Sequence, residues 1–238
     1  MINKKGAIES RYIIMIIILI ASFAALLIFF FMLDIDDIIT QETCKSSIAL
    51  KSIPLISVAM SVNCPIQDVC IYKKGVCVGA SDNAKKTQIS EEGEEFKKAV
   101  MKKLAEIEVN AWSTVYEGKK DFPKKEDNCL LLYRIYFDNL VEGIGDIKYS
   151  EYKLFLKENK INSELSYFDY LDEENKGKNE IENKIEKENK KENNGQLIYE
   201  LDKPLAVVVA GGDVKRVFLM EYSPDSLKKL DCEVVNFV

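Results

Sequence analysis

The stretch from Tyr12 to Leu33 constrains this chain more than any other feature, because it contains no charged residue. As an α-helix rising about 1.5 Å per residue it would be roughly 33 Å long, enough to cross a hydrocarbon core of about 30 Å. A single segment in lipid can satisfy all of its backbone hydrogen bonds internally only as a helix. Residues 12–33 are therefore predicted to be a transmembrane helix in contact with membrane lipid.

The charges on either side of this segment predict its orientation. Three cationic residues precede the segment and three aspartates follow it: Lys4, Lys5, Arg11, Asp34, Asp36 and Asp37. The positively charged side of a membrane helix stays in the cytoplasm. Residues 1–11 are thus predicted to be a cytoplasmic lead. The chain is expected to be a single-pass protein of the cell membrane, with its C-terminal part outside.

The lead leaves one alternative open. Lys5 and Gly6 followed by Ala7 resemble the archaeal type of pilin-like signal, in which a Lys/Arg-Gly pair precedes the processed bond. That resemblance implies a filament subunit that is processed after Gly6 and starts at Ala7. Arg11 departs from the pattern, since it lies inside the segment that would have to pack in a filament. An uncleaved signal anchor is the main prediction. A conventional cleaved signal is disfavoured, because the apolar run is too long and no small-x-small site follows it.

Charge and composition exclude several classes of function. Residues 1–33 have a net charge of +2, from Lys4, Lys5 and Arg11 against Glu9. The whole chain has a net charge of −6, so the remaining residues carry −8. An acidic outer part without a dense basic face argues against nucleic-acid binding, which depends on neutralising phosphates. Histidine is absent, which excludes Ser-His-Asp and Cys-His catalysis and mixed Cys/His zinc sites within the chain. We predict no cofactor and no metal.

All the cysteines follow the apolar segment. They are Cys44, Cys64, Cys70, Cys77, Cys129 and Cys232. An even number in an oxidising compartment favours two or three disulfides, with a thiolate metal site or buried free thiols as alternatives. Cys70 and Cys77 are expected to lie near one another across a hairpin, and Cys232 to attach the terminal strand to an earlier element.

Residues 48–171 and 197–238 are predicted to form an extracytoplasmic α+β domain, with an antiparallel sheet packed on one long helix. Residues 34–47 would be a polar spacer, and 172–196 a disordered charged insertion, because this stretch holds too few apolar residues to form a core. The long helix is expected from Ser90 to Glu117, from its apolar stripe and the following Gly118. Strands are expected at 48–62, 129–137, 197–201 and 232–237, with hairpins at 69–78, turning at Gly75, and at 205–210 with 214–222. Short helical elements are expected at 150–158, 166–171 and 223–230.

Two groups of side chains are weighed as binding or catalytic sites. Tyr149, Tyr152, Tyr167 and Tyr170 would line a carbohydrate or peptide groove, or else pack at the rim of the sheet; Trp112 is expected in the core. Carboxylate-only hydrolysis needs two converging acids. The candidates Asp138, Glu142 and Asp146 show no diagnostic spacing, so no catalytic residue is predicted.

Several positions together resemble a group of small, uncharacterised archaeal membrane-anchored surface proteins. They are the basic lead and anchor, Cys64-Pro65, Trp112 followed by Gly118-Lys119, Cys129 at the start of an aromatic strand, the helical pair 149–171 and the closing hairpin. The group's pattern has a Cys just before the Trp and a Cys-x-x-Cys opening the next strand, where this chain has Asn110 and Leu132. The resemblance implies that Cys129 forms a disulfide with a cysteine outside these two positions. It implies no activity for this chain.

The leading functional hypothesis is a bitopic surface protein whose outer domain binds or scaffolds another protein, without catalysis. The alternatives are the pilin-like filament subunit and the carboxylate-only extracytoplasmic hydrolase.

Overall fold

The computed structural model describes residues 12–25, 35–53, 62–119, 128–172, 198–210, 216–229 and 233–234. The chain divides into two units, Met1–Glu42 and Thr43–Val238. In the first unit, residues 12–25 are helical and their side chains are exposed. The helix α2 (Ile35–Lys51) begins in the first unit and ends in the second.

The predicted membrane span is described only in part. Residues 12–25 form a helix, while 26–33 and the lead 1–11, including Gly6 and Ala7, lie outside the described residues. Among the helices that the structure describes, none has both the length and the apolar character needed to cross a membrane.

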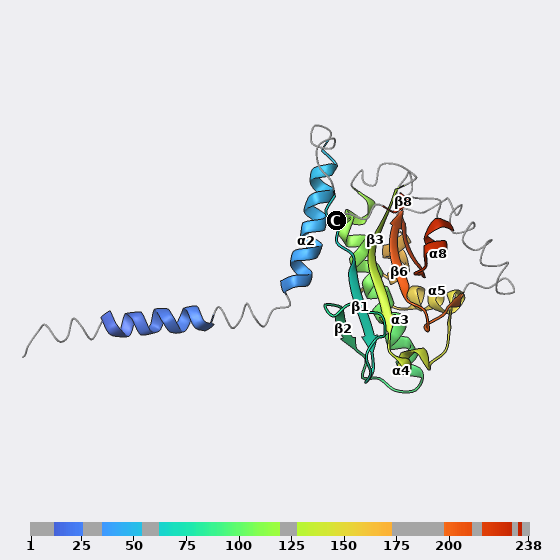
Figure 1. Ribbon diagram of the computed structural model, residues 1–238, viewed down its shortest axis with the longest axis horizontal. Helices are drawn as coiled ribbons and strands as arrows, with labels where there is room; N and C mark the ends of the chain where they lie inside the picture. The colour runs from blue at the N-terminus through green and yellow to red at the C-terminus, as the bar shows by residue number, and fades with distance from the viewer. Residues whose placement is uncertain are drawn as a thin grey trace, which may run out of the picture. The chain divides into compact units, whose positions relative to one another are not determined.

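A mixed sheet forms the centre of the second unit, with six strands among the described residues (Figure 1). Their order is β2-β1-β3-β6-β7, and β8 also pairs with β3. The pairs β1–β2, β1–β3 and β3–β8 are parallel, whereas β3–β6 and β6–β7 are antiparallel. The bounds are β1 Gln67–Tyr72, β2 Lys85–Gln88, β3 Asn128–Phe137, β6 Leu205–Ala210, β7 Arg216–Glu221 and β8 Glu233–Val234.

The α+β class is therefore confirmed, and the antiparallel sheet is wrong. The long helix α3 (Glu94–Thr114) explains the difference. This helix lies between β2 and β3 in the chain, and it returns the chain to the end of the sheet from which β2 started. A connection of this kind places the following strand parallel to the earlier ones. The predicted central strand and the β6–β7 hairpin are both present, and the loop 211–215 lies outside the described residues.

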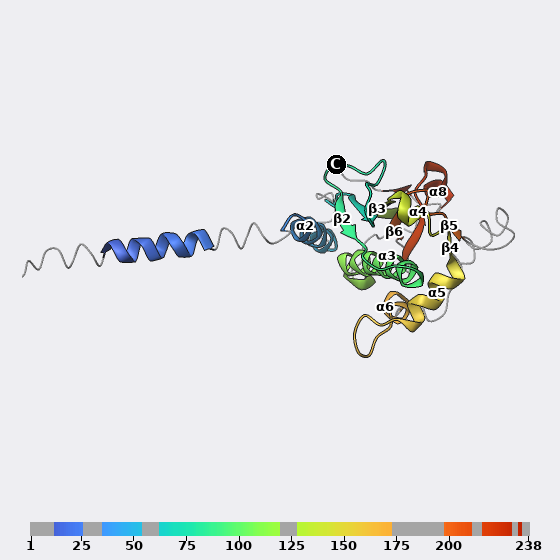
Figure 2. The same ribbon diagram turned by 90° about the horizontal axis from the view of Figure 1, so that it is seen from below.

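Helix α3 covers one face of the sheet and forms the main core with it (Figure 2). Its buried stripe includes Phe96, Val100 and Leu104, as its periodicity predicts, and Trp112 is buried as expected. The predicted start at Ser90 is wrong. The helix follows Gly93, whose φ of 61° ends the preceding loop without a side-chain cap.

Shorter elements complete the second unit. The bounds are the 3₁₀ turn η1 Tyr116–Gly118, α4 Asn139–Glu142, β4 Ile147–Lys148, α5 Tyr149–Glu158, α6 Tyr167–Asp172, β5 Ile198–Tyr199 and α8 Pro224–Lys229. Helices α5, α6 and α8 agree with the prediction. Strand β5 pairs with β4 in a separate small sheet, so its predicted place in the main sheet is wrong. The insertion lies outside the described residues after Asp172.

The predicted spacer and first strand are also corrected, because α2 occupies residues 35–51. Cys44 and Ile48 are both buried and stand four residues apart. That spacing places them on one side of a helix, which the β-branched composition of this stretch concealed. Residues 54–61 lie outside the described residues.

Candidate interaction site

Residues 73–84 link the neighbouring parallel strands β1 and β2, and we call this segment the crossover. Parallel neighbours need a connection of a dozen or more residues, which is usually a helix. Here it contains no helix. The hairpin predicted at 69–78 is therefore wrong: the chain leaves β1, passes beside the sheet and returns as a parallel strand.

The crossover lies on the face of the sheet opposite α3. Val69 and Ile71 of β1 belong to the α3 core, so the alternating Cys70 points to the other face. Cys70 is bonded there to Cys77 of the crossover. A Cβ built on Gly79 would stand 3.6 Å from the ring of Tyr136, the residue of β3 that is paired with Cys70.

Asp138 attaches the start of the crossover to the end of β3. Its Oδ2 accepts the backbone N–H groups of Lys73, Lys74 and Gly75 at 3.0, 3.2 and 2.8 Å, and its Oδ1 accepts that of Val141 at 2.9 Å. The side chain is fully buried. Burial alone would raise the pKa of Asp138, but the four backbone hydrogen bonds outweigh it and hold this pKa below its ordinary value. Asp138 is thus a buried carboxylate.

Gly75 lets the backbone approach that carboxylate. A Cβ at this position would lie 3.0 Å from Asp138 Oδ2 and from Asn139 Oδ1. The sequence predicts Gly75 as the turn residue of a hairpin, but it is not one of the described glycines with a positive φ. Space, rather than backbone conformation, explains the glycine.

The disulfide between Cys70 and Cys77 attaches the middle of the crossover, with its Cα atoms 5.7 Å apart. The proximity predicted for these two cysteines is confirmed, although no hairpin brings them together. Cys70 is buried and Cys77 is half-buried.

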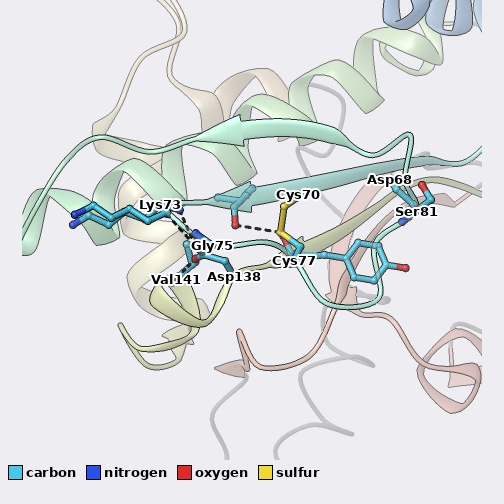
Figure 3. The surroundings of a disulfide bond; sticks show 11 residues. Asp68, Cys70, Lys73, Gly75, Cys77, Ser81, Asp138 and Val141 are labelled. Atoms are coloured by element: carbon cyan, nitrogen blue, oxygen red, sulfur yellow. Dashed lines mark hydrogen bonds between the residues drawn. A yellow bond between two sulfur atoms is a disulfide. The ribbon is translucent and has the colours of Figure 1, made fainter.

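Asp68 of β1 attaches the end of the crossover. Its Oδ2 accepts the backbone N–H of Ser81 at 3.3 Å. Both carboxylate oxygens also accept from Arg134 of β3, at 2.7 Å from Nε and 3.0 Å from Nη2. The three attachments follow one another along the segment in Figure 3, from Asp138 through the disulfide to Asp68. The crossover is therefore held at its start, middle and end.

The outward side of the crossover carries the row Lys74, Val76 and Val78, which alternates with the inward Gly75 and Cys77. Val76 is 76% exposed and Val78 is 86% exposed, more than any other large apolar side chain among the described residues. Exposed apolar side chains that stand close together mark interaction sites more often than singly exposed ones do. We call this row, with Lys86 beside it on β2, the crossover surface.

Asp138 does not fit the general acid of the carboxylate-only hydrolase. Glycoside hydrolysis needs a general acid that is protonated at working pH, whereas Asp138 is ionised and its oxygens are occupied by backbone N–H groups. Its position after a strand and before a helix is an N-cap signal that sequence reasoning missed.

Of the two alternatives for the four tyrosines, packing is the one observed. Tyr149 and Tyr170 are partly buried against the core. Tyr152 and Tyr167 are buried in the core, and the ring of Tyr199 meets that of Tyr152 edge-on at 5.9 Å. Tyr152 Oη donates a hydrogen bond to Glu108 Oε2. Glu108, a charged residue of α3, is only 5% exposed. Burial raises its pKa to about 7, against the opposing effect of the Tyr152 hydrogen bond.

The disulfide prediction is confirmed, and the alternative of free thiols or a thiolate metal site is wrong for the described cysteines. Cys44 is bonded to Cys64, Cys70 to Cys77, and Cys129 is also disulfide-bonded. No cysteine in the described ranges is a free thiol. The bond at Cys129 agrees with the archaeal resemblance, which itself stays a prediction.

Comparison with protein-family models, with curated proteins and with solved structures finds no match to this chain.

Proposed function

We propose that this protein is a single-pass cell-surface protein, anchored through residues 12–33, whose outer domain binds another protein at the crossover surface. The observation that carries the proposal is the exposure of Val76 and Val78 on a segment attached at three places. Full burial of a valine side chain contributes roughly 1.5 kcal/mol or more. A backbone that is already ordered loses little conformational entropy when a partner covers it.

The anchor and the location rest on separate observations. The uncharged stretch 12–33 is long enough for a span, and the flanking charges favour a location of the second unit outside the cell. The disulfides of that unit are typical of an oxidising compartment. The uncleaved anchor and the pilin-like alternative differ at Gly6 and Ala7. Mass spectrometry of the N-terminal peptide from native membranes distinguishes a chain that starts at Met1 from one that starts at Ala7.

Site-specific photo-crosslinking tests the binding surface. A photoreactive residue is placed at Val76 in the full-length chain in native membranes, and at Leu154 as the matched control. Leu154 is 55% exposed on α5 and is also aliphatic. We expect a discrete protein adduct from position 76 that position 154 does not give. No adduct at 76, or the same adducts at both positions, would contradict the proposal.

A further inference from the structure

We propose that the partner of the crossover surface is an acidic, extended protein segment, whose carboxylates pair with Lys74 and Lys86 while its aliphatic side chains cover Val76 and Val78. This inference rests on the proposed function and names the chemistry of the partner.

The crossover and β2 carry a net positive charge. Residues 73–88 contain Lys73, Lys74, Lys85 and Lys86 against Asp82, which is four positive charges less one negative, or +3. The whole chain has a net charge of −6. The crossover and β2 are therefore a basic region on an acidic protein. Such a region attracts an acidic partner.

Within this region, Lys74 and Lys86 are not neutralised by nearby carboxylates. Asp68 is occupied by Arg134, and Asp138 by backbone N–H groups. Glu92 lies 3.7 Å from Lys73 but is 82% exposed, so this ion pair is weak. Among the described residues, no carboxylate forms an ion pair with Lys74 or Lys86. Both ammonium groups are thus available to a partner.

Geometry places the lysines and the valines on one side. Lys86 is paired in register with Cys70, and paired residues of neighbouring strands point to the same face. Cys70 is the residue bonded to the crossover, so Lys86 projects on the crossover side. Lys74, Val76 and Val78 are the exposed residues of a bent segment in which Gly75 and Cys77 are half-buried, and β2 is the edge strand of the described sheet. An extended partner segment can pair with such an edge strand through its backbone.

A membrane surface fits less well. Attraction to anionic lipid is worth about 1 kcal/mol per basic residue near the surface, and stable attachment needs a larger apolar insertion than two valines. The site also lacks the aromatic side chains that favour the interface. A protein segment supplies carboxylates at fixed positions, which a fluid bilayer does not.

The test selects peptides against the full-length protein in nanodiscs of neutral lipid. A random-peptide phage library is panned on the protein and depleted on the V76S/V78S variant. Selected peptides are then measured on K74Q/K86Q and on two controls, L154S and K102Q. Lys102 is exposed on α3, away from the crossover. We expect peptides that combine acidic and aliphatic residues. Their affinity should fall about tenfold on either double variant and stay unchanged on the controls.

The outcomes separate this inference from the proposed function. Peptides that need the valines but show no acidic bias, and that bind K74Q/K86Q normally, would overturn the acidic partner and leave protein binding intact. If every selected peptide binds V76S/V78S as tightly as the original protein, both the acidic partner and protein binding at the crossover surface are overturned. A third outcome is that no peptide is selected, while the nanodisc-held protein binds phosphatidylglycerol vesicles and V76S/V78S does not. That outcome would replace the protein partner by lipid. An unchanged reduced-to-oxidised mass difference shows that each variant keeps its disulfides.

Discussion

Asp138, at the end of β3, accepts the backbone N–H of Gly75 at 2.8 Å across a separation of 63 residues. The same carboxylate accepts from Lys73 and Lys74 and caps α4 through Val141. One side chain thereby joins the exit of β1 to the exit of β3, two parallel neighbours whose ends lie side by side. The exposed row of the crossover depends on this contact, because it begins at Lys74.

Asp138→Ala is expected to lower the free energy of unfolding by about 3 kcal/mol, because several backbone N–H groups lose their charged acceptor in a buried place. Asp138→Asn should have a smaller effect, since its amide oxygen still accepts hydrogen bonds. Urea unfolding of the full chain measures both. Asp82→Asn, an exposed change in the same segment, is the control. Equal stability of D138A and D82N would contradict this role of Asp138.

Gly75→Ala is expected to destabilise the protein by roughly 1–3 kcal/mol, because the new methyl would press on Asp138 Oδ2 and Asn139 Oδ1. The double variant Gly75→Ala with Asp138→Ala should lose less than the sum of the two single changes, since the close contact with Asp138 Oδ2 disappears with the carboxylate. A thermodynamic cycle from unfolding curves measures this difference. Additive losses would show that the glycine serves another purpose.

Glu108 is expected to make stability fall as the pH rises. Burial raises its folded pKa from an ordinary 4.5 to about 7, so the folded state binds the proton more tightly than the unfolded state. Its stabilising effect is complete below pH 4.5 and disappears as the pH rises through 7. The change is roughly 3 kcal/mol. Glu108→Gln should remove this slope in unfolding measured across that range. Glu158→Gln, at an exposed position of α5, should keep it.

Cys129 is expected to be bonded to Cys232. Cys129 is disulfide-bonded while Cys44, Cys64, Cys70 and Cys77 pair among themselves. Strand β8 follows Cys232 directly and pairs Val234 with Cys129. Non-reducing peptide mapping should therefore yield a fragment that joins residues 129 and 232. Recovery of Cys232 as an alkylated thiol before reduction would contradict this pairing.

The sequence alone determined the elements that depend on neighbouring residues. The apolar stripe of α3, the aromatic strand β3, the β6–β7 hairpin and α8 all followed from periodicity and turn residues. The proximity of Cys70 and Cys77 followed from their short separation, although for the wrong reason. Where local signals conflicted, as in the β-branched end of α2, burial of Cys44 and Ile48 in the main core decided for a helix.

Only the tertiary structure decided the parallel pairing of β1 with β2 and β3, the crossover and the burial of Glu108. Each depends on groups far apart in the chain. Asp138 looks like any polar residue after a strand until the fold brings Lys73, Lys74 and Gly75 to its oxygens. Glu108 looks like a surface residue of α3 until α5 covers it with Tyr152. Periodicity records which side of an element is apolar, whereas the fold determines what lies against that side.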